Sequence, residues 1–254
     1  MKSFIPLSLL LSATTLAAPT AVPAEGASFP ITDLIDSDLT IKQYAAALEA
    51  ESPSSSPATG EVQKRQFNGD TFNQLTDGTP CREVTLIYAR GTTQDGNVGD
   101  AASEGPTFFN ALAAALGGTS RLAVQGVDYA ANVFGFLLGG DPAGVTKMGE
   151  LINQAATQCP STKIVLSGYS QGAQVSQKAA RGLSASVAGR VNAVLNFGDP
   201  FRDDPDFGLI PADKTRIICH DGDNICEGGI IITAEHRNYE RDAADAAAFV
   251  VSKL

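Results

Sequence analysis

The 254-residue chain contains only two histidines and four cysteines, and its basic side chains are outnumbered by acidic ones. With 18 Lys+Arg against 28 Asp+Glu, the formal net charge is −10. An acidic chain lacks the positive surface that attracts nucleic acids and anionic membranes, so we expect neither as a partner. The chain also lacks an Asn-X-Ser/Thr sequence, and N-glycosylation is therefore not expected.

The first 17 residues have the pattern of a secretory signal peptide. Lys2 supplies the positive charge, residues 4–11 form a short apolar run, and small residues around Ala17 and Ala18 offer a cleavage site. The run is short for a bilayer, although a membrane anchor or an ordinary core helix is the alternative reading. No later run is long and apolar enough to span a membrane, so we expect a soluble, secreted, extracellular protein with no stable membrane association.

Residues 18–65 predict a propeptide or linker. Residues 31–48 have the pattern of a short amphipathic helix, and residues 51–60 are rich in Ser and Pro. The dibasic pair Lys64-Arg65 then stands directly before Gln66. This pair suits a processing protease of the secretory pathway, while a solvated charge pair in a linker is the alternative. We therefore expect the catalytic domain to span residues 66–254.

Apolar segments rich in β-branched residues alternate with helix-like segments along this domain. We expect strands at residues 83–89, 122–127, 163–167, 191–197 and 215–219, and helices at residues 106–116, 143–158, 173–183 and 242–251. Such alternation predicts a three-layer α/β fold with a central, mostly parallel sheet flanked by helices. In sheets of this kind, active residues gather at the carboxyl ends of the strands.

All four cysteines lie in the expected catalytic domain, and an even number behind a signal peptide predicts two disulfides. Three pairings are possible. Cys219 and Cys226 bracket a short loop, so we expect them to pair and to leave Cys81 with Cys159. The cysteine spacing fits no zinc pattern, so we expect no metal and no cofactor.

The sequence Gly168-Tyr169-Ser170-Gln171-Gly172 is the most informative motif. It follows an expected strand and precedes an expected helix. A serine between two glycines at such a turn is the nucleophile elbow of α/β-hydrolases, although Gly-X-Ser-X-Gly alone is also compatible with an ordinary turn. The motif predicts that Ser170 is the nucleophile of an esterase.

A serine nucleophile needs a histidine base, and that histidine needs a carboxylate. The chain order in α/β-hydrolases is serine, acid, histidine. Asp223 followed by His236 satisfies this order, and Asp221 is a rival acid. His220 is the rival base, and it would have to use an earlier acid such as Asp199.

Several of these segments together resemble the fungal cutinases, over nearly all of residues 81–254. The shared segments are the elbow, the short cysteine loop at residues 219–226, the histidine segment at residues 234–239, and Ala89-Arg90-Gly91-Thr92-Thr93 after the first expected strand. The resemblance implies an α/β-hydrolase fold, with Asp223 as the acid. It also implies an oxyanion hole formed by the backbone N–H groups of Thr92 and Gln171, and an exposed active site without a large lid.

By the same resemblance, the expected activity is that of a serine esterase. Its substrates would be cutin, a polyester of hydroxy fatty acids, and short-chain esters, hydrolysed through a Ser170–His236–Asp223 triad and an acyl-enzyme. Two apolar segments, residues 133–138 and 228–232, are candidates for the lining of the acyl groove. Packing in the hydrophobic core is the alternative for both. The alternatives are an acetylxylan esterase of the same fold, whose members usually carry more cysteines, and an inactive secreted effector. We expect a monomer.

Overall fold

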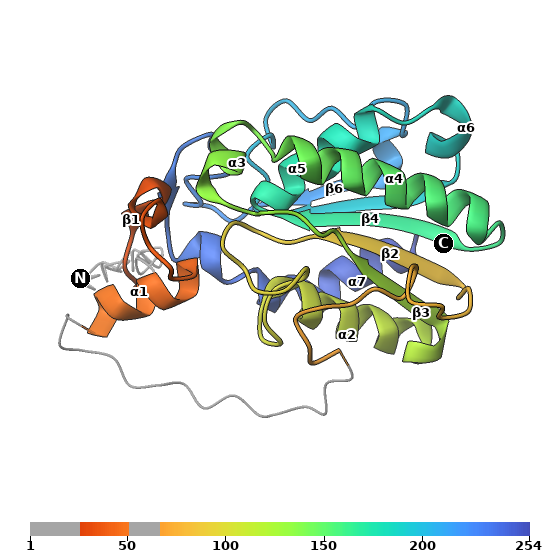
Figure 1. Ribbon diagram of the computed structural model, residues 1–254, viewed down its shortest axis with the longest axis horizontal. Coiled ribbons are helices and arrows are strands. Elements are labelled where there is room, and N and C mark those ends of the chain that lie inside the picture. Colours follow the sequence, from red (N-terminus) through yellow and green to blue (C-terminus); the bar gives the residue numbers. More distant parts are fainter. Residues whose placement is uncertain (1–25, 51–66) are drawn as a thin grey trace, which may run out of the picture.

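The computed structural model describes residues 26–50 and 67–254, so the predicted signal peptide and the dibasic pair lie outside the described residues. A five-stranded parallel sheet occupies the centre, in the order β3-β2-β4-β5-β6. The strands are β3 (Leu122–Gly126), β2 (Val84–Ala89), β4 (Lys163–Tyr169), β5 (Val191–Phe197) and β6 (Thr215–Ile218). The predicted parallel α/β fold is confirmed (Figure 1).

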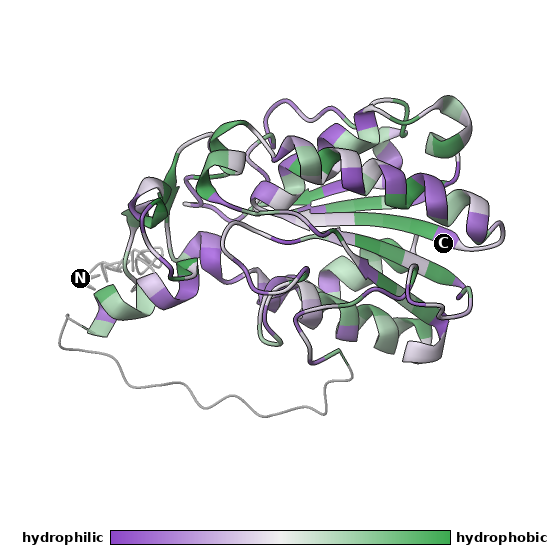
Figure 2. Cartoon of the chain, viewed as in Figure 1, coloured by the Kyte–Doolittle hydropathy of each residue, from purple (hydrophilic) through white to green (hydrophobic). Residues whose placement is uncertain are grey.

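Helices cover both faces of this sheet. One face packs against α2 (Glu104–Leu116) and α7 (Ala243–Val251), and the other packs against α4 (Pro142–Gln158) and α5 (Gln171–Arg181). Successive side chains of a strand point to opposite faces, so Leu86 joins the first core and its neighbour Ile87 joins the second. Figure 2 shows the hydrophobic strands enclosed between helices that carry hydrophilic residues on their outer surfaces.

Shorter elements complete the catalytic domain. They are α3 (Val133–Leu137), α6 (Ala185–Ala188), β7 (Ile231–Ile232) and the 3-10 helices η2 (Thr119–Arg121), η3 (Ala212–Lys214), η4 (Glu235–Arg237) and η5 (Tyr239–Asp242). No helix in residues 26–50 or 67–254 is both long and apolar enough to cross a membrane.

The central strand β4 is longer than expected and ends at Tyr169 instead of Ser167. Its pairing with both neighbours continues to the elbow, where Gly168 lies opposite Ala89 of β2 and Tyr169 lies opposite Phe197 of β5. Helix α5 then begins at Gln171, earlier than the predicted start at residue 173. Ser170 is thus the one residue between strand and helix.

Residues 26–50 form a compact segment packed on the catalytic domain, which we call the N-terminal segment. It contains β1 (Phe29–Pro30), η1 (Ile31–Leu34) and α1 (Ile41–Ala50), and β1 pairs antiparallel with β7. The short amphipathic helix expected within residues 31–48 is present as α1, and η1 precedes it as a separate piece. The division follows from a capping box, in which Thr40 Oγ1 accepts from the N–H of Gln43 at 3.2 Å and Gln43 Oε1 accepts from the N–H of Thr40 at 2.9 Å.

Candidate active site

The elbow turns so sharply that neither of its glycines has room for a side chain. A β-carbon on Gly168 would lie 2.2 Å from the carbonyl oxygen of Gly172, and one on Gly172 would lie 2.0 Å from that of Ala89. Ser170 between them has φ 56° and ψ −119°, a conformation that L-residues rarely adopt. Its N–H donates to the carbonyl of Phe197 at 3.0 Å, which ties the turn to β5.

The side chains of Ser170, His236 and Asp223 form a chain of two hydrogen bonds. Ser170 Oγ is 2.9 Å from His236 Nε2, and His236 Nδ1 is 2.8 Å from Asp223 Oδ2. All three side chains are buried. Since the carboxylate can only accept, Nδ1 carries the proton in this tautomer and Nε2 is left to accept from the serine hydroxyl. This arrangement has the geometry of a nucleophile, a base and the acid that orients the base.

The short cysteine loop holds the carboxylate of Asp223 in place. Cys219 and Cys226 form a disulfide, and Asp223 Oδ1 accepts from the N–H groups of Ile225 at 3.0 Å and Cys226 at 3.4 Å. Burial by itself would raise the pKa of Asp223, but the hydrogen bond and electrostatic attraction of His236 lower it below its ordinary value, with a further contribution from the hydroxyl of Tyr239. Asp223 is thus kept ionised despite its burial.

The rival residues are engaged elsewhere. His220 places its two ring nitrogens 2.8 Å from the carbonyl of Glu235 and 2.7 Å from Asp242 Oδ2, so neither nitrogen bonds Ser170. Asp199 is buried and accepts from the amide groups of Gln177 and Asn196. Asp221 is exposed on the same loop as Asp223, and the ring nitrogens of both histidines bond other groups.

Thr92 and Gln171 are both buried beside Ser170, at the ends of β2 and β4. The side-chain amide of Gln171 donates to Thr92 Oγ1 at 2.9 Å and to the carbonyl of Asn132 at 2.8 Å. Neither of their backbone N–H groups has a hydrogen-bond partner within residues 26–50 and 67–254. Two unengaged N–H groups at the start of a helix and in the facing loop are suited to an oxyanion.

Comparison with known proteins identifies the family of the chain. Residues 80–254 match the family described as Cutinase. The chain belongs to the cutinase family. A cutinase of Botryotinia fuckeliana is 48% identical over 170 residues, which cover 67% of this chain and 82% of that protein. The chain is therefore a carboxylic ester hydrolase.

Solved structures of related enzymes share the fold. A Trichoderma reesei cutinase, solved with a phosphonate inhibitor, is 40% identical, with a TM-score of 0.69 over 88% of this chain and 91% of that one. An acetyl xylan esterase is 26% identical, with a TM-score of 0.55 over 68% of this chain and 99% of that one. The first of these matches extends beyond the catalytic domain, because residues 80–254 alone amount to a smaller share of the chain.

The site is covered while the N-terminal segment is docked, whereas the resemblance implied an exposed site without a large lid for the catalytic domain. Ser170 and His236 each have 0% of their surface exposed. The N-terminal segment packs at the end of the sheet that carries the site, and the N–H of Ile41 donates to Thr93 Oγ1 at 2.9 Å, one residue beyond Thr92 (Figure 1). The covering segment was included in the predicted propeptide, but sequence patterns gave no indication of where it would dock.

The two segments proposed as the acyl groove form the walls on which the N-terminal segment rests. One apolar cluster joins residues of that segment to both walls: Phe29, Ile31, Leu34, Ile41, Ala45, Val133, Phe136, Ile225 and Ile232. Outside this cluster, Phe134, Leu137 and Leu138 of the first wall and Ile230 of the second stay exposed. The walls therefore have an apolar inner surface, covered by the segment, and an exposed apolar rim.

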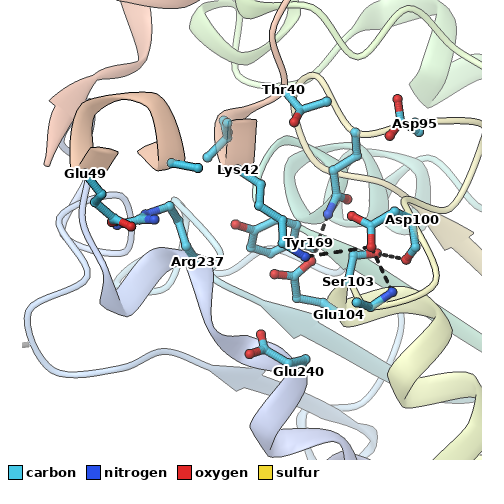
Figure 3. Close-up of a pocket in the computed structure, with 14 residues that line it drawn as sticks. Thr40, Lys42, Glu49, Asp95, Asp100, Ser103, Glu104, Tyr169, Arg237 and Glu240 are labelled. Atoms are coloured by element: carbon cyan, nitrogen blue, oxygen red, sulfur yellow. Dashed lines mark hydrogen bonds and ion pairs between the residues drawn. The ribbon is translucent and has the colours of Figure 1, made fainter. Parts of the chain in front are cut away.

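Polar contacts fasten α1 at its far end. Arg237, which directly follows His236, donates to Glu49 Oε1 at 3.1 Å and to the carbonyl of Ala27 at 2.9 Å. Figure 3 shows Glu49 and Arg237 side by side across this boundary. Between α1 and the catalytic domain lies a cavity of about 330 Å³ that reaches Tyr169 and the buried Glu104, but not Ser170 or His236.

Two tyrosines at the site were not assigned a role from the sequence. The ring of Tyr169 stacks on His236 with 5.2 Å between centroids, and its hydroxyl donates to the carbonyl of His236 at 2.7 Å. Tyr239 donates to Asp223 Oδ2 at 2.6 Å. Their positions gave a weak signal, since Tyr169 stands inside the elbow motif and Tyr239 three residues after the histidine. Only the fold shows what the two hydroxyl groups contact.

Proposed function

We propose that the chain is a secreted serine esterase that hydrolyses cutin and short-chain acyl esters through Ser170, His236 and Asp223. The observation that carries this proposal is the pair of hydrogen bonds, 2.9 Å and 2.8 Å long, that joins the three side chains at a nucleophile elbow. Membership of the cutinase family supports the ester chemistry.

The geometry supports an acyl-transfer mechanism in two stages. Ser170 Oγ attacks the ester carbonyl carbon while its proton passes to His236 Nε2. The negative charge that develops on the carbonyl oxygen is held by the N–H groups of Thr92 and Gln171. The alcohol leaves with the proton returned by His236, and the acyl group remains on Ser170 as an ester. Water, deprotonated by His236, then attacks this ester, and the acid is released as Ser170 recovers its proton.

The apolar walls favour an aliphatic acyl chain over a sugar-bound acetyl group. Val133 and Phe136 on one side and Ile232 on the other would face such a chain once the N-terminal segment has left. The fold shared with an acetyl xylan esterase makes acetyl release from xylan the second candidate. A panel of cutin, butyrate esters and acetylated xylan separates them, and faster turnover of acetylated xylan would reverse our order.

The triad is tested by Ser170→Ala, with Ser167→Ala as its matched control. Ser167 lies in β4, three residues before Ser170, and is equally buried, but its hydroxyl has no hydrogen-bond partner among the described residues. We expect Ser170→Ala to lose about 10⁴-fold or more of kcat on p-nitrophenyl butyrate, while Ser167→Ala keeps the parent rate. Retention of activity in a folded Ser170→Ala protein would exclude Ser170 as the nucleophile. Failure of an organophosphorus ester to label the uncovered parent protein would favour the inactive effector.

We also propose that residues 1–17 are removed as a signal peptide and residues 18–65 as a propeptide. The docking of residues 26–50 over the site supports a covering role for the propeptide before its removal. N-terminal sequencing of the secreted protein tests the processing, and we expect it to begin at Gln66. A secreted and active protein that begins well before Gln66 would contradict it.

A further inference from the structure

The catalytic-site carboxylate has a buried partner besides His236. Tyr239 is fully buried in η5, and its hydroxyl donates to Asp223 Oδ2, the same oxygen that accepts from His236 Nδ1. At 2.6 Å, this is a short O–H···O⁻ bond of the charge-assisted kind. The two donors approach one oxygen, while the backbone donors of the cysteine loop occupy the other.

The tyrosine is itself held by the second histidine of the chain. The ring of His220 lies against that of Tyr239 with 4.0 Å between centroids and 15° between planes. The N–H of His220 donates to the hydroxyl oxygen of Tyr239 at 3.0 Å, so the hydroxyl proton is left for Asp223. The two ring nitrogens of His220 are fixed by Glu235 and Asp242.

These contacts form a continuous path from the surface to the nucleophile. Asp242 and Glu235 fix His220, His220 fixes the ring and hydroxyl of Tyr239, and Tyr239 fixes the oxygen of Asp223 that orients His236. Tyr169 stacks on the ring of His236 and donates to its carbonyl, and its hydroxyl makes no hydrogen bond to Asp223 among the described residues. Among the described tyrosines, Tyr239 alone bonds the carboxylate.

We infer that Tyr239 is a positioning residue for ester hydrolysis, and that His220 acts through it. Tyr239 holds Asp223 Oδ2 in line with His236 Nδ1 and shares the negative charge of that oxygen. The inference rests on the proposed function, because it assumes that Asp223 orients the catalytic base. Tyr239 touches neither Ser170 nor the space above it, so its removal should change kcat and leave KM nearly unchanged.

The test is Tyr239→Phe, with Tyr88→Phe as the matched control. Both substitutions delete one buried tyrosine hydroxyl, but that of Tyr88 has no hydrogen-bond partner within residues 26–50 and 67–254. We expect Tyr239→Phe to lower kcat on p-nitrophenyl butyrate by about tenfold to a hundredfold, with KM within about twofold. The acid limb of the kcat/KM profile should move to higher pH. The reason is that Asp223, no longer shared with a hydroxyl, stabilises protonated His236 more strongly. Tyr88→Phe should keep the parent kcat and acid limb.

A double-mutant cycle tests the second half of the path. His220→Ala should lower kcat by about threefold to tenfold and move the acid limb in the same direction. His220→Ala keeps the backbone N–H that donates to the Tyr239 hydroxyl and removes the ring that stacks on the tyrosine. Because that ring acts by holding the hydroxyl in place, the double variant should be no slower than Tyr239→Phe alone. If Tyr239→Phe does not fold, the position of the acid limb in His220→Ala still decides the question.

Three results would overturn the inference. One is parent kcat and an unmoved acid limb in folded Tyr239→Phe. The second is a fall in kcat with an unmoved acid limb, which describes a purely structural role. The third is losses that multiply in the double variant. Loss of activity in Ser170→Ala together with the first result would reject this inference and leave the proposed function standing, whereas an active Ser170→Ala would reject the function itself.

Discussion

Loosening the N-terminal segment should raise esterase activity, although the substitution weakens the folded protein. The sharpest substitution is Ile31→Ala in a Lys64→Gln/Arg65→Gln background, which removes the dibasic pair and should keep the chain uncleaved. Ile31 is fully buried in the cluster that joins the N-terminal segment to both walls of the site. Its loss weakens the docked state but removes nothing that the catalytic domain needs.

The magnitude follows from the cost of the cavity. Truncating a buried isoleucine to alanine costs about 2–5 kcal/mol. If that cost falls on docking alone, the ratio of docked to open segment falls by about 30-fold to several thousand-fold, since 1.36 kcal/mol is a factor of ten. The rate of ester hydrolysis rises with the open fraction and stops rising when the segment is fully open.

Two assays follow the opening: hydrolysis of a soluble butyrate ester, and the rate at which an organophosphorus ester labels Ser170. The matched control is Ile152→Ala in the same background. Ile152 is equally buried, but it belongs to the core on the α4 face of the sheet. We expect Ile31→Ala to raise both rates, and Ile152→Ala to lower thermal stability without raising either. The reasoning is refuted if Ile31→Ala leaves both rates at the parent value, or if Ile152→Ala raises them equally.

Three further predictions concern neighbouring features. Glu49→Ala, which removes a partly exposed partner of Arg237, should raise the activity of the uncleaved chain by no more than about fivefold in the same ester assay. Burial raises the pKa of Glu104 to about 7 from 4.5, so its contribution to stability falls as pH rises from about 4.5 to about 7. Glu104→Gln should therefore gain up to roughly 3 kcal/mol over the parent at pH 8 and nothing near pH 4, measured by denaturant unfolding. Replacing Cys81 and Cys159 by serine should lower the free energy of unfolding by about 4 kcal/mol and leave kcat unchanged. Replacing Cys219 and Cys226 by serine should lower it by about 2 kcal/mol and remove most of kcat, because that loop carries Asp223.

The catalytic domain was largely predictable because its signals are local. Strands β2 and β5 are buried on both faces, so their sequences are nearly continuous apolar runs, and the helices show helical periodicity. The elbow was predictable for a similar reason, since a turn this tight accepts only glycine at residues 168 and 172. The errors there were small and lay at element ends, where pairing with β2 and β5 extended β4 by two residues.

The pairing of distant residues was less accessible. The order of serine, acid and histidine favoured Asp223 and His236, but it left Asp221, Asp199 and His220 as rivals. The proposed choice among them rests on the distance between Ser170 and His236, and a distance between residues 66 positions apart depends on the whole fold. The role of Tyr239 has the same origin, because its hydroxyl reaches Asp223 only when η5 packs under the cysteine loop.

The amino-acid sequence by itself determined the parallel α/β fold, the elbow serine and the family resemblance, because each depends on residues that are neighbours along the chain. Only the tertiary structure decided that the N-terminal segment covers the site. Its apolar residues have the pattern of any amphipathic segment. Such a pattern predicts that one face will be buried, but it does not indicate which surface that face will contact. The docking position is set by the strand pairing of β1 with β7 and by the two apolar walls beside Ser170. Both walls lie more than 80 residues after the N-terminal segment along the chain.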